Sequence, residues 1–244
     1  MSRCRLLLVS TCFSLLWVMG CKSNEGIFSS AKEGNLAKLQ EYLKSGVNIN
    51  AIDEEQNTPL HFAVMGGHQS MLDFLVKNGA KINTKNKQGV SPLLLSIRLN
   101  RKGIVNSLIR QGADIHLTDN GLRTPIMYAI TFSEPDIVKL LLSKGASITS
   151  RDDMERDLMV FAGLKGNMEI IQLLHGKGVA IDNKSKSGET ALWWAAYAGH
   201  VDAVRFFLKH GANKNNVNNR GQSPYDAAAA RGNTEIMKIL KNHR

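Results

Sequence analysis

The chain has 244 residues, 43% of them hydrophobic, and a formal net charge of +10 at pH 7. This apolar fraction is ordinary for a folded protein and too low for one built mainly from membrane-spanning segments. The sequence holds no HExxH zinc motif, no Walker-type phosphate loop and no GxSxG nucleophile motif. We therefore expect a protein that is not an enzyme, with no metal site and no cofactor.

The first twenty residues have the pattern of an export signal. Arg3 and Arg5 precede an apolar run from 6 to 20, which is too short to span a membrane comfortably. Residues 18–21 read Val-Met-Gly-Cys, which resembles the lipobox of bacterial lipoproteins, where cleavage precedes a cysteine that is then acylated. The resemblance implies removal of residues 1–20 and a palmitate-type lipid anchor at Cys21. Ordinary signal-peptidase cleavage after Gly20 is the alternative.

Cysteine usage agrees with export. Cys4 and Cys12 lie within the signal, so Cys21 is the single cysteine after cleavage and no intramolecular disulfide can form. Lys22 follows the cysteine, and by resemblance to well-studied lipoproteins it favours the outer membrane. We expect a protein of the bacterial cell envelope, anchored by lipid to the outer membrane and facing the periplasm.

A 33-residue period runs through the rest of the chain. The phrase TPLHFA at 58–63 recurs, with substitutions, at 91–96, 124–129, 190–195 and 223–228, and a degenerate copy stands at 157–162. This period with TPLH opening a helix identifies the chain as resembling ankyrin repeats. The resemblance implies an all-α solenoid of helix pairs joined by β-turn or hairpin loops, with terminal capping repeats.

The repeat register divides the chain into units. An acylated cysteine with a short linker, 21–25, precedes an N-terminal capping repeat, 26–52. Repeats 1 to 5 then occupy 53–85, 86–118, 119–151, 152–184 and 185–217, and repeat 6, a C-terminal capping repeat, occupies 218–244. Repeat 4 has Asp157-Leu158 for Thr-Pro and Glu155 for the turn glycine. Because a good helix cap is worth about 1 kcal/mol, we expect repeat 4 to be the weakest unit.

Ankyrin-repeat proteins usually bind partners through the turn tips and the first helix of each unit, which line a concave groove. Basic residues outnumber acidic ones at the corresponding positions, and an apolar stripe runs beside them. The resemblance also implies that Trp193 reaches the groove edge and that Trp194 is buried. The residues expected to bind a partner are Met65, Leu99, Arg98, Arg123, Phe132, Arg151, Arg156, Leu164, Lys165, Lys184, Lys186, Trp193, Tyr197, Arg220 and Arg231.

A groove of one charge sign attracts ligands of the opposite sign, so we expect an acidic protein partner for a monomeric scaffold. The alternatives are an anionic lipid, a cell-wall polymer or another polyanion, or basic residues that only solvate the turn tips. Nucleic acid is not expected, because the chain is exported and lacks an obvious stacking array. For His61, His68 and His200 the resemblance implies hydrogen bonds within and between repeats.

Overall fold

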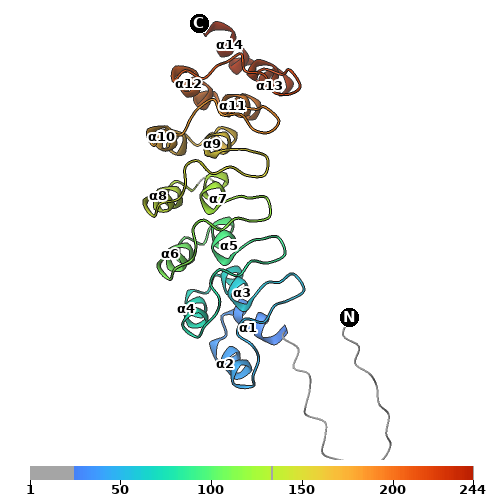
Figure 1. The fold of residues 1–244 in the computed structure, drawn as a ribbon, viewed down its shortest axis with the longest axis vertical. Helices are drawn as coiled ribbons and strands as arrows, with labels where there is room; N and C mark the ends of the chain where they lie inside the picture. Colours follow the sequence, from blue (N-terminus) through green and yellow to red (C-terminus); the bar gives the residue numbers. More distant parts are fainter. Residues whose placement is uncertain (1–24, 133, 244) are drawn as a thin grey trace, which may run out of the picture.

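The computed structural model describes residues 25–132 and 134–243, and every regular element within these residues is an α-helix. Each 33-residue unit contributes an inner helix and an outer helix, and the units stack into one elongated array (Figure 1). The inner helices are α1 (Glu25–Glu33), α3 (Pro59–Gly66), α5 (Pro92–Arg98), α7 (Pro125–Thr131), α9 (Leu158–Lys165), α11 (Ala191–Ala198) and α13 (Pro224–Ala230). The outer helices are α2 (Leu36–Lys44), α4 (Gln69–Lys77), α6 (Lys102–Arg110), α8 (Pro135–Ser143), α10 (Met168–Gly176), α12 (Val201–Lys209) and α14 (Thr234–Asn242).

The repeated Thr-Pro or Ser-Pro phrase sets where the inner helices begin. The Ser91 hydroxyl accepts a hydrogen bond from the Leu94 N–H, 3.3 Å away, and Pro92 occupies the first helical position, where no N–H is needed. The Thr190 hydroxyl accepts a similar bond from the Trp193 N–H at 3.3 Å. The same few residues therefore start an inner helix once in every period. The first unit differs, because α1 begins at Glu25, inside the segment predicted as linker.

Repeat 4 is capped, contrary to the sequence-based expectation. Asp157 lies at the N-cap of α9, and its Oδ1 accepts a hydrogen bond from the Val160 N–H at 2.9 Å. Its Oδ2 accepts a second bond from the Asn183 side chain at 2.7 Å, which ties α9 to the turn entering the next repeat. Aspartate caps helices as well as threonine does. The departure from Thr-Pro therefore gives no reason for repeat 4 to be weak at its cap.

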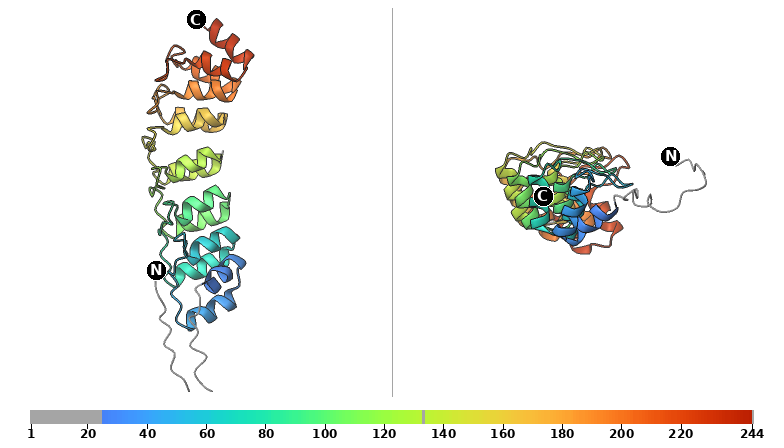
Figure 2. Two further views of the ribbon diagram at one scale, coloured as in Figure 1. Left: turned by 90° about the vertical axis from the view of Figure 1, so that its right-hand side faces the viewer. Right: turned by 90° about the horizontal axis from the view of Figure 1, so that it is seen from below.

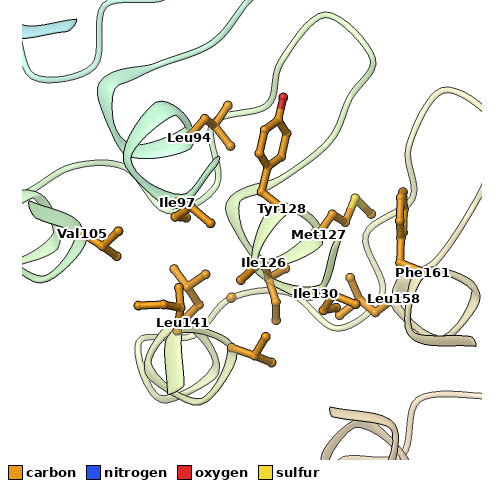
Figure 3. Packing of buried hydrophobic residues seen from close by; sticks show 14 of the residues in the cluster. Leu94, Ile97, Val105, Ile126, Met127, Tyr128, Ile130, Leu141, Leu158 and Phe161 are labelled. Atoms are coloured by element: carbon orange, nitrogen blue, oxygen red, sulfur yellow. The ribbon is translucent and has the colours of Figure 1, made fainter. Parts of the chain in front are cut away.

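The core is a continuous layer between the inner and outer helices. In Figure 3, Ile97, Val105, Ile126 and Leu141 converge from α5, α6, α7 and α8, and each is at most 1% exposed. Because each unit buries its apolar residues only against its neighbours, the stability of the array depends on every interface along it. None of the helices within the described residues is long and apolar enough to cross a membrane.

The turns lie on the side away from the outer helices (Figure 1), and Figure 2 shows them as a row along one edge of the array. One backbone hydrogen bond links each turn to the next, for example from the Asn120 N–H to the Gln88 carbonyl at 3.1 Å. Within each turn, the side chain of the unit's first residue accepts hydrogen bonds from backbone N–H groups of the residues that follow it. The Asp119 carboxylate, for instance, accepts from Gly121 N–H and Arg123 N–H, both at 2.9 Å.

Candidate functional site

The turns and the inner helices together form one surface, which we call the inner face. Most of the residues predicted to bind a partner are exposed on it: Arg98, Leu99, Arg123, Phe132, Arg151, Lys165, Lys184, Lys186, Arg220 and Arg231. Met65, Arg156, Leu164 and Tyr197 are partly exposed. Phe132 and Leu99 are large apolar residues with 42% and 39% of their surface exposed. The inner face thus combines positive charge with exposed apolar groups.

A cavity of about 560 Å³ opens between repeats 5 and 6, and we call it the repeat 5–6 pocket. Four of the predicted residues line it: Lys186, Trp193, Tyr197 and Arg220. The other lining residues are Ser187, Glu189, Trp194, Asn218, Asn219, Gln222, Ala227 and Ala230. Its walls are therefore the inner helices α11 and α13 and the turns that precede them.

A smaller cavity of about 170 Å³ lies between repeats 2 and 3. Arg98, Arg123 and Phe132 line it, together with Tyr128 and Thr131. Arg151 borders a third cavity of about 260 Å³, which includes Asp157 and Asn183. The remaining predicted residues line none of these three cavities: Met65, Leu99, Arg156, Leu164, Lys165, Lys184 and Arg231.

Arg123 and Arg156 are engaged within their own turns. Arg123 pairs with the Asp119 carboxylate at 2.7 Å, and Arg156 pairs with that of Asp152 at 2.6 Å. The two aspartate side chains are 2% and 0% exposed, so each arginine compensates a buried charge. Neither aspartate was among the residues predicted to bind a partner, and their pairing with the arginines was not expected from the sequence.

Tyr128, on the inner helix α7, also bonds to the turn of repeat 3. Its hydroxyl donates to the Asp119 carboxylate at 2.8 Å, and in Figure 3 the ring points away from Ile126 and Leu141. Burial alone would raise the pKa of Asp119, but the bonds from Arg123 and Tyr128 outweigh it and hold this pKa below its usual value. Burial, followed by the bond to Asp119, raises the pKa of Tyr128 to about 12. The bonds from Arg123 and Tyr128 therefore stabilise the turn with the Asp119 carboxylate ionised.

The two tryptophans of α11 reverse the expected order of exposure. Trp193 is 9% exposed, whereas Trp194 is partly exposed, although Trp194 was expected to be the buried one. The Trp193 ring stacks on Tyr197 with centroids 5.4 Å apart and an interplanar angle of 12°. Trp194 meets both rings edge-on, at 5.1 Å from Trp193 and 5.9 Å from Tyr197. The three rings form one aromatic wall of the repeat 5–6 pocket.

Several cations of the inner face have no ion-pair partner among the described residues: Arg98, Lys165, Lys186, Arg220 and Arg231. Arg231 lies over the Tyr197 ring, with its Cζ 5.0 Å from the ring centroid. Lys186 and Arg220 border the repeat 5–6 pocket. Of these five residues, Arg98 belongs to repeat 2 and the other four belong to repeats 4 to 6.

His61 and His200 make the hydrogen bonds that the resemblance implied, whereas the His68 ring makes none to the described residues and only packs against its neighbours. His61 Nδ1 lies 2.9 Å from the Thr58 hydroxyl, and its Nε2 lies 3.0 Å from the Val90 carbonyl of the next repeat. His200 Nε2 lies 3.0 Å from the Leu164 carbonyl of the preceding repeat. His68 packs against Gly34 and Gly66, where an added Cβ would overlap its ring. Across the described ranges, no three His, Cys, Asp or Glu side chains gather as a metal site would require.

Sequence reasoning missed Ala227 and Ala230 as residues of the pocket. Both are small where the same positions of repeat 5 carry Trp194 and Tyr197. Aligning the repeats by position would have shown this loss of volume. The predicted signal, Cys21 and Lys22 all lie outside the described residues.

Comparison with known proteins gives one consistent result. A family model of ankyrin repeats in three copies matches residues 27–119 and 158–244, and a single-repeat ankyrin model matches residues 122–153. The human ASB11 ankyrin repeat domain superposes with a TM-score of 0.75 over 88% of this chain and 96% of that one. The two sequences are 24% identical, so this likeness concerns the fold.

A curated protein, osteoclast-stimulating factor 1 from Gallus gallus, is 40% identical over 47 residues. The match covers 19% of this chain and 23% of that protein. It therefore concerns a short part of the array.

Proposed function

This chain belongs to the ankyrin-repeat family, and we propose that it is a lipid-anchored scaffold that binds an acidic protein partner through its inner face. Ankyrin-repeat proteins are typically interaction modules without catalytic activity. The anchor in this proposal is acylated Cys21, and the location is the bacterial outer membrane on its periplasmic side.

The observation that carries the proposal is the combination of free cations and exposed apolar side chains on one face. Lys165, Lys186 and Arg220 have no ion-pair partner among the described residues. Phe132 and Tyr197 lie on the same face. Cations at the rim accelerate association with an acidic surface, and buried aromatic groups slow dissociation. A polyanion would use the charge but would leave the apolar groups without a role.

The test is photocrosslinking in intact cells. A photoreactive residue at Phe132 is compared with one at Asn106, an exposed position on the outer helix α6. We expect a protein adduct from position 132 and none from 106, with a yield that falls as salt is raised. Adducts with lipid or cell-wall polymer in place of protein would overturn the choice of partner. Protein adducts from 106 alone would overturn the choice of face.

The anchor has a separate test in the substitution Cys21→Ala. Because acyl chains contribute about 0.8 kcal/mol per buried CH2, their loss removes the membrane attachment. We expect the variant either to appear in the soluble periplasmic fraction or to accumulate as a precursor of higher mass, measured by fractionation and mass spectrometry. A processed variant that stays in the membrane fraction after a high-salt wash would contradict the proposal.

A further inference from the structure

The repeat 5–6 pocket exists because repeat 6 lacks a side chain that the other repeats have. At the tenth position of the unit, repeats 1 to 5 carry Phe62, Leu95, Tyr128, Phe161 and Trp194, and repeat 6 carries Ala227. In repeats 3 and 4 the ring at this position lies beneath the arginine of its own turn. The Arg123 Cζ is 5.4 Å from the Tyr128 centroid, and the Arg156 Cζ is 4.9 Å from that of Phe161. In repeat 6 the corresponding space, under Gln222, is part of the pocket.

The aromatic wall of the pocket carries hydrogen-bond donors without acceptors. The indole Nε1 atoms of Trp193 and Trp194 are both buried, and neither has a hydrogen-bond partner within the described part of the chain. In repeat 1, His61 occupies the position of Trp193 and its ring nitrogen reaches the Val90 carbonyl at 3.0 Å. A buried donor without an acceptor costs free energy that a ligand acceptor recovers. Both rings line the pocket although their Nε1 atoms are closed to solvent, so a ligand that brings acceptor atoms gains these bonds when a ring turns toward it.

The charge at the pocket rim selects an anionic acceptor. Lys186 and Arg220 line the pocket and are exposed, and neither has an ion-pair partner among the residues described. The single acidic lining residue, Glu189, accepts a hydrogen bond of 2.5 Å from the Ser185 hydroxyl. Its carboxylate is therefore engaged within the turn. The two free cations leave the rim positive.

We infer that the repeat 5–6 pocket binds a peptide segment of the partner that presents an apolar side chain next to a carboxylate. The apolar side chain fills the space beside Ala227 and contacts the ring of Trp194. The carboxylate pairs with Lys186 and Arg220 at the rim, and a turn of a tryptophan ring toward the pocket lets it accept from an indole N–H as well. This inference rests on the proposed function and adds to it the anchor site and the chemistry of the ligand.

Tryptophan fluorescence reports binding in the pocket, because the sequence holds three tryptophans and two of them line it. Protein carrying Trp17→Phe, so that the two pocket tryptophans are the only ones in the precursor as well as in the processed form, is titrated with pools of random nonapeptides that contain a fixed central Phe-Glu pair. Matched pools carry Phe-Gln, Phe-Lys or Gly-Glu, and two further pools end in Phe with a free or an amidated carboxyl group. We expect the Phe-Glu pool, or the free-carboxyl pool, to shift the tryptophan emission at concentrations roughly tenfold lower than the controls do. The two active arms distinguish a side-chain carboxylate from a chain terminus.

Two helix substitutions locate the binding. Ala230→Leu places a bulkier side chain at the pocket wall, and Ala229→Leu makes the same change one residue away, where the side chain is also exposed but does not line the pocket. We expect Ala230→Leu to abolish the shift and Ala229→Leu to preserve it, with equal thermal unfolding midpoints for both. The pair Lys186→Gln and Arg220→Gln should weaken binding about tenfold and remove its salt dependence.

Equal binding by the two leucine variants, or no preference among the peptide pools, would overturn the inference. If crosslinking at Phe132 still yields an acidic protein in that case, the proposed function stands and the anchor lies elsewhere on the inner face. If neither experiment detects a partner, both proposals fail.

Discussion

His61 joins repeats 1 and 2 through both of its ring nitrogens, which requires one particular protonation state. The Thr58 N–H donates to Nδ1 at 3.2 Å, so Nδ1 must be unprotonated while Nε2–H donates to the Val90 carbonyl. Burial lowers the pKa of His61 below its usual 6.5, and it outweighs the opposing effects of Val90 and Asp53. Below pH 6.5, His61 therefore binds a proton in the unfolded chain, whereas in the folded chain it takes up this proton only at a lower pH. Stability is retained above that pH and lost as the pH falls.

The substitution His61→Leu tests this, because repeat 2 has Leu94 at the same position. At pH 7.5 we expect a loss of about 1–3 kcal/mol from the missing hydrogen bonds. Between pH 7.5 and 5 the variant should lose less stability than the parent, measured by urea unfolding. His116→Asn, at an exposed position, is the control and should keep the parent's dependence. An unchanged pH dependence in His61→Leu would exclude this histidine as its source.

At this scale, sequence reasoning located the basic residues of the inner face but not their partners. Asp119 and Arg123 are four residues apart within a turn, and their pairing depends on how that turn folds. Counting charges by face treated Arg123 and Arg156 as free, although each compensates a buried aspartate. The same count included Lys186 and Arg220, which have no ion-pair partner among the described residues.

The turns of the repeats share one backbone shape but are filled by different residues. At the fourth position of the unit the backbone is left-handed: Gly89 has a φ of 75° and Gly221 one of 72°, but Leu122 has a φ of 57°. A non-glycine residue in this region costs about 1–2 kcal/mol. Leu122 is also 52% exposed, so its side chain contributes little packing.

We therefore expect Leu122→Gly to stabilise the protein by about 0.5–1 kcal/mol, after allowance for the greater freedom of glycine in the unfolded chain. The matched control is Leu122→Ala, which removes the same apolar surface but keeps the strained conformation. Equal changes in the two midpoints of chemical unfolding would show that the backbone conformation is not the cause. Replacing Gly89, the glycine at the same position in repeat 2, is not an equivalent test, because a Cβ there would lie 2.6 Å from the Asn120 backbone nitrogen.

Helix starts were predictable because each depends on a few adjacent residues. Ser91-Pro92 and Thr124-Pro125 begin α5 and α7 as expected from their sequence. Asp157-Leu158 was treated as a departure because other repeats have Thr-Pro or Ser-Pro there, yet the Asp157 carboxylate caps α9 in the same way. The bond from Asn183 to Asp157 joins residues 26 positions apart, and no local pattern indicates it.

At the scale of the whole molecule, the packing of the array depends on how closely neighbouring units approach one another. The 33-residue period predicted the stacking itself, because one unit cannot bury its apolar face alone. It did not predict the repeat 5–6 pocket, which comes from a difference between repeats: Trp194 in α11 faces a unit with Ala227 at the same position. A second difference lies between repeats 4 and 5, where Gly163 takes the position held by Ile130 in repeat 3.

Gly163 allows α9 to pack directly on the backbone of α11. A Cβ added there would lie 2.4 Å from the Ala191 carbonyl oxygen, so Gly163→Ala must push the two inner helices apart. We expect the interface between repeats 4 and 5 to lose about 1–3 kcal/mol, as in other overpacked cores. Repeats 5 and 6 then depend mainly on each other, and two units are too few for a stable stack. They should unfold at lower denaturant than the units before them.

Two probes separate these parts of the array. With Trp17→Phe as background, tryptophan fluorescence reports on repeat 5, and circular dichroism at about 222 nm reports on all helices. In the parent we expect the two unfolding curves to coincide, and in Gly163→Ala we expect the fluorescence midpoint to fall below the dichroism midpoint. Gly176→Ala is the matched control in the same repeat, because a Cβ there meets nothing within 4 Å. If the curves of Gly163→Ala still coincide, the units are coupled by more than this interface, and the array unfolds as a single cooperative body.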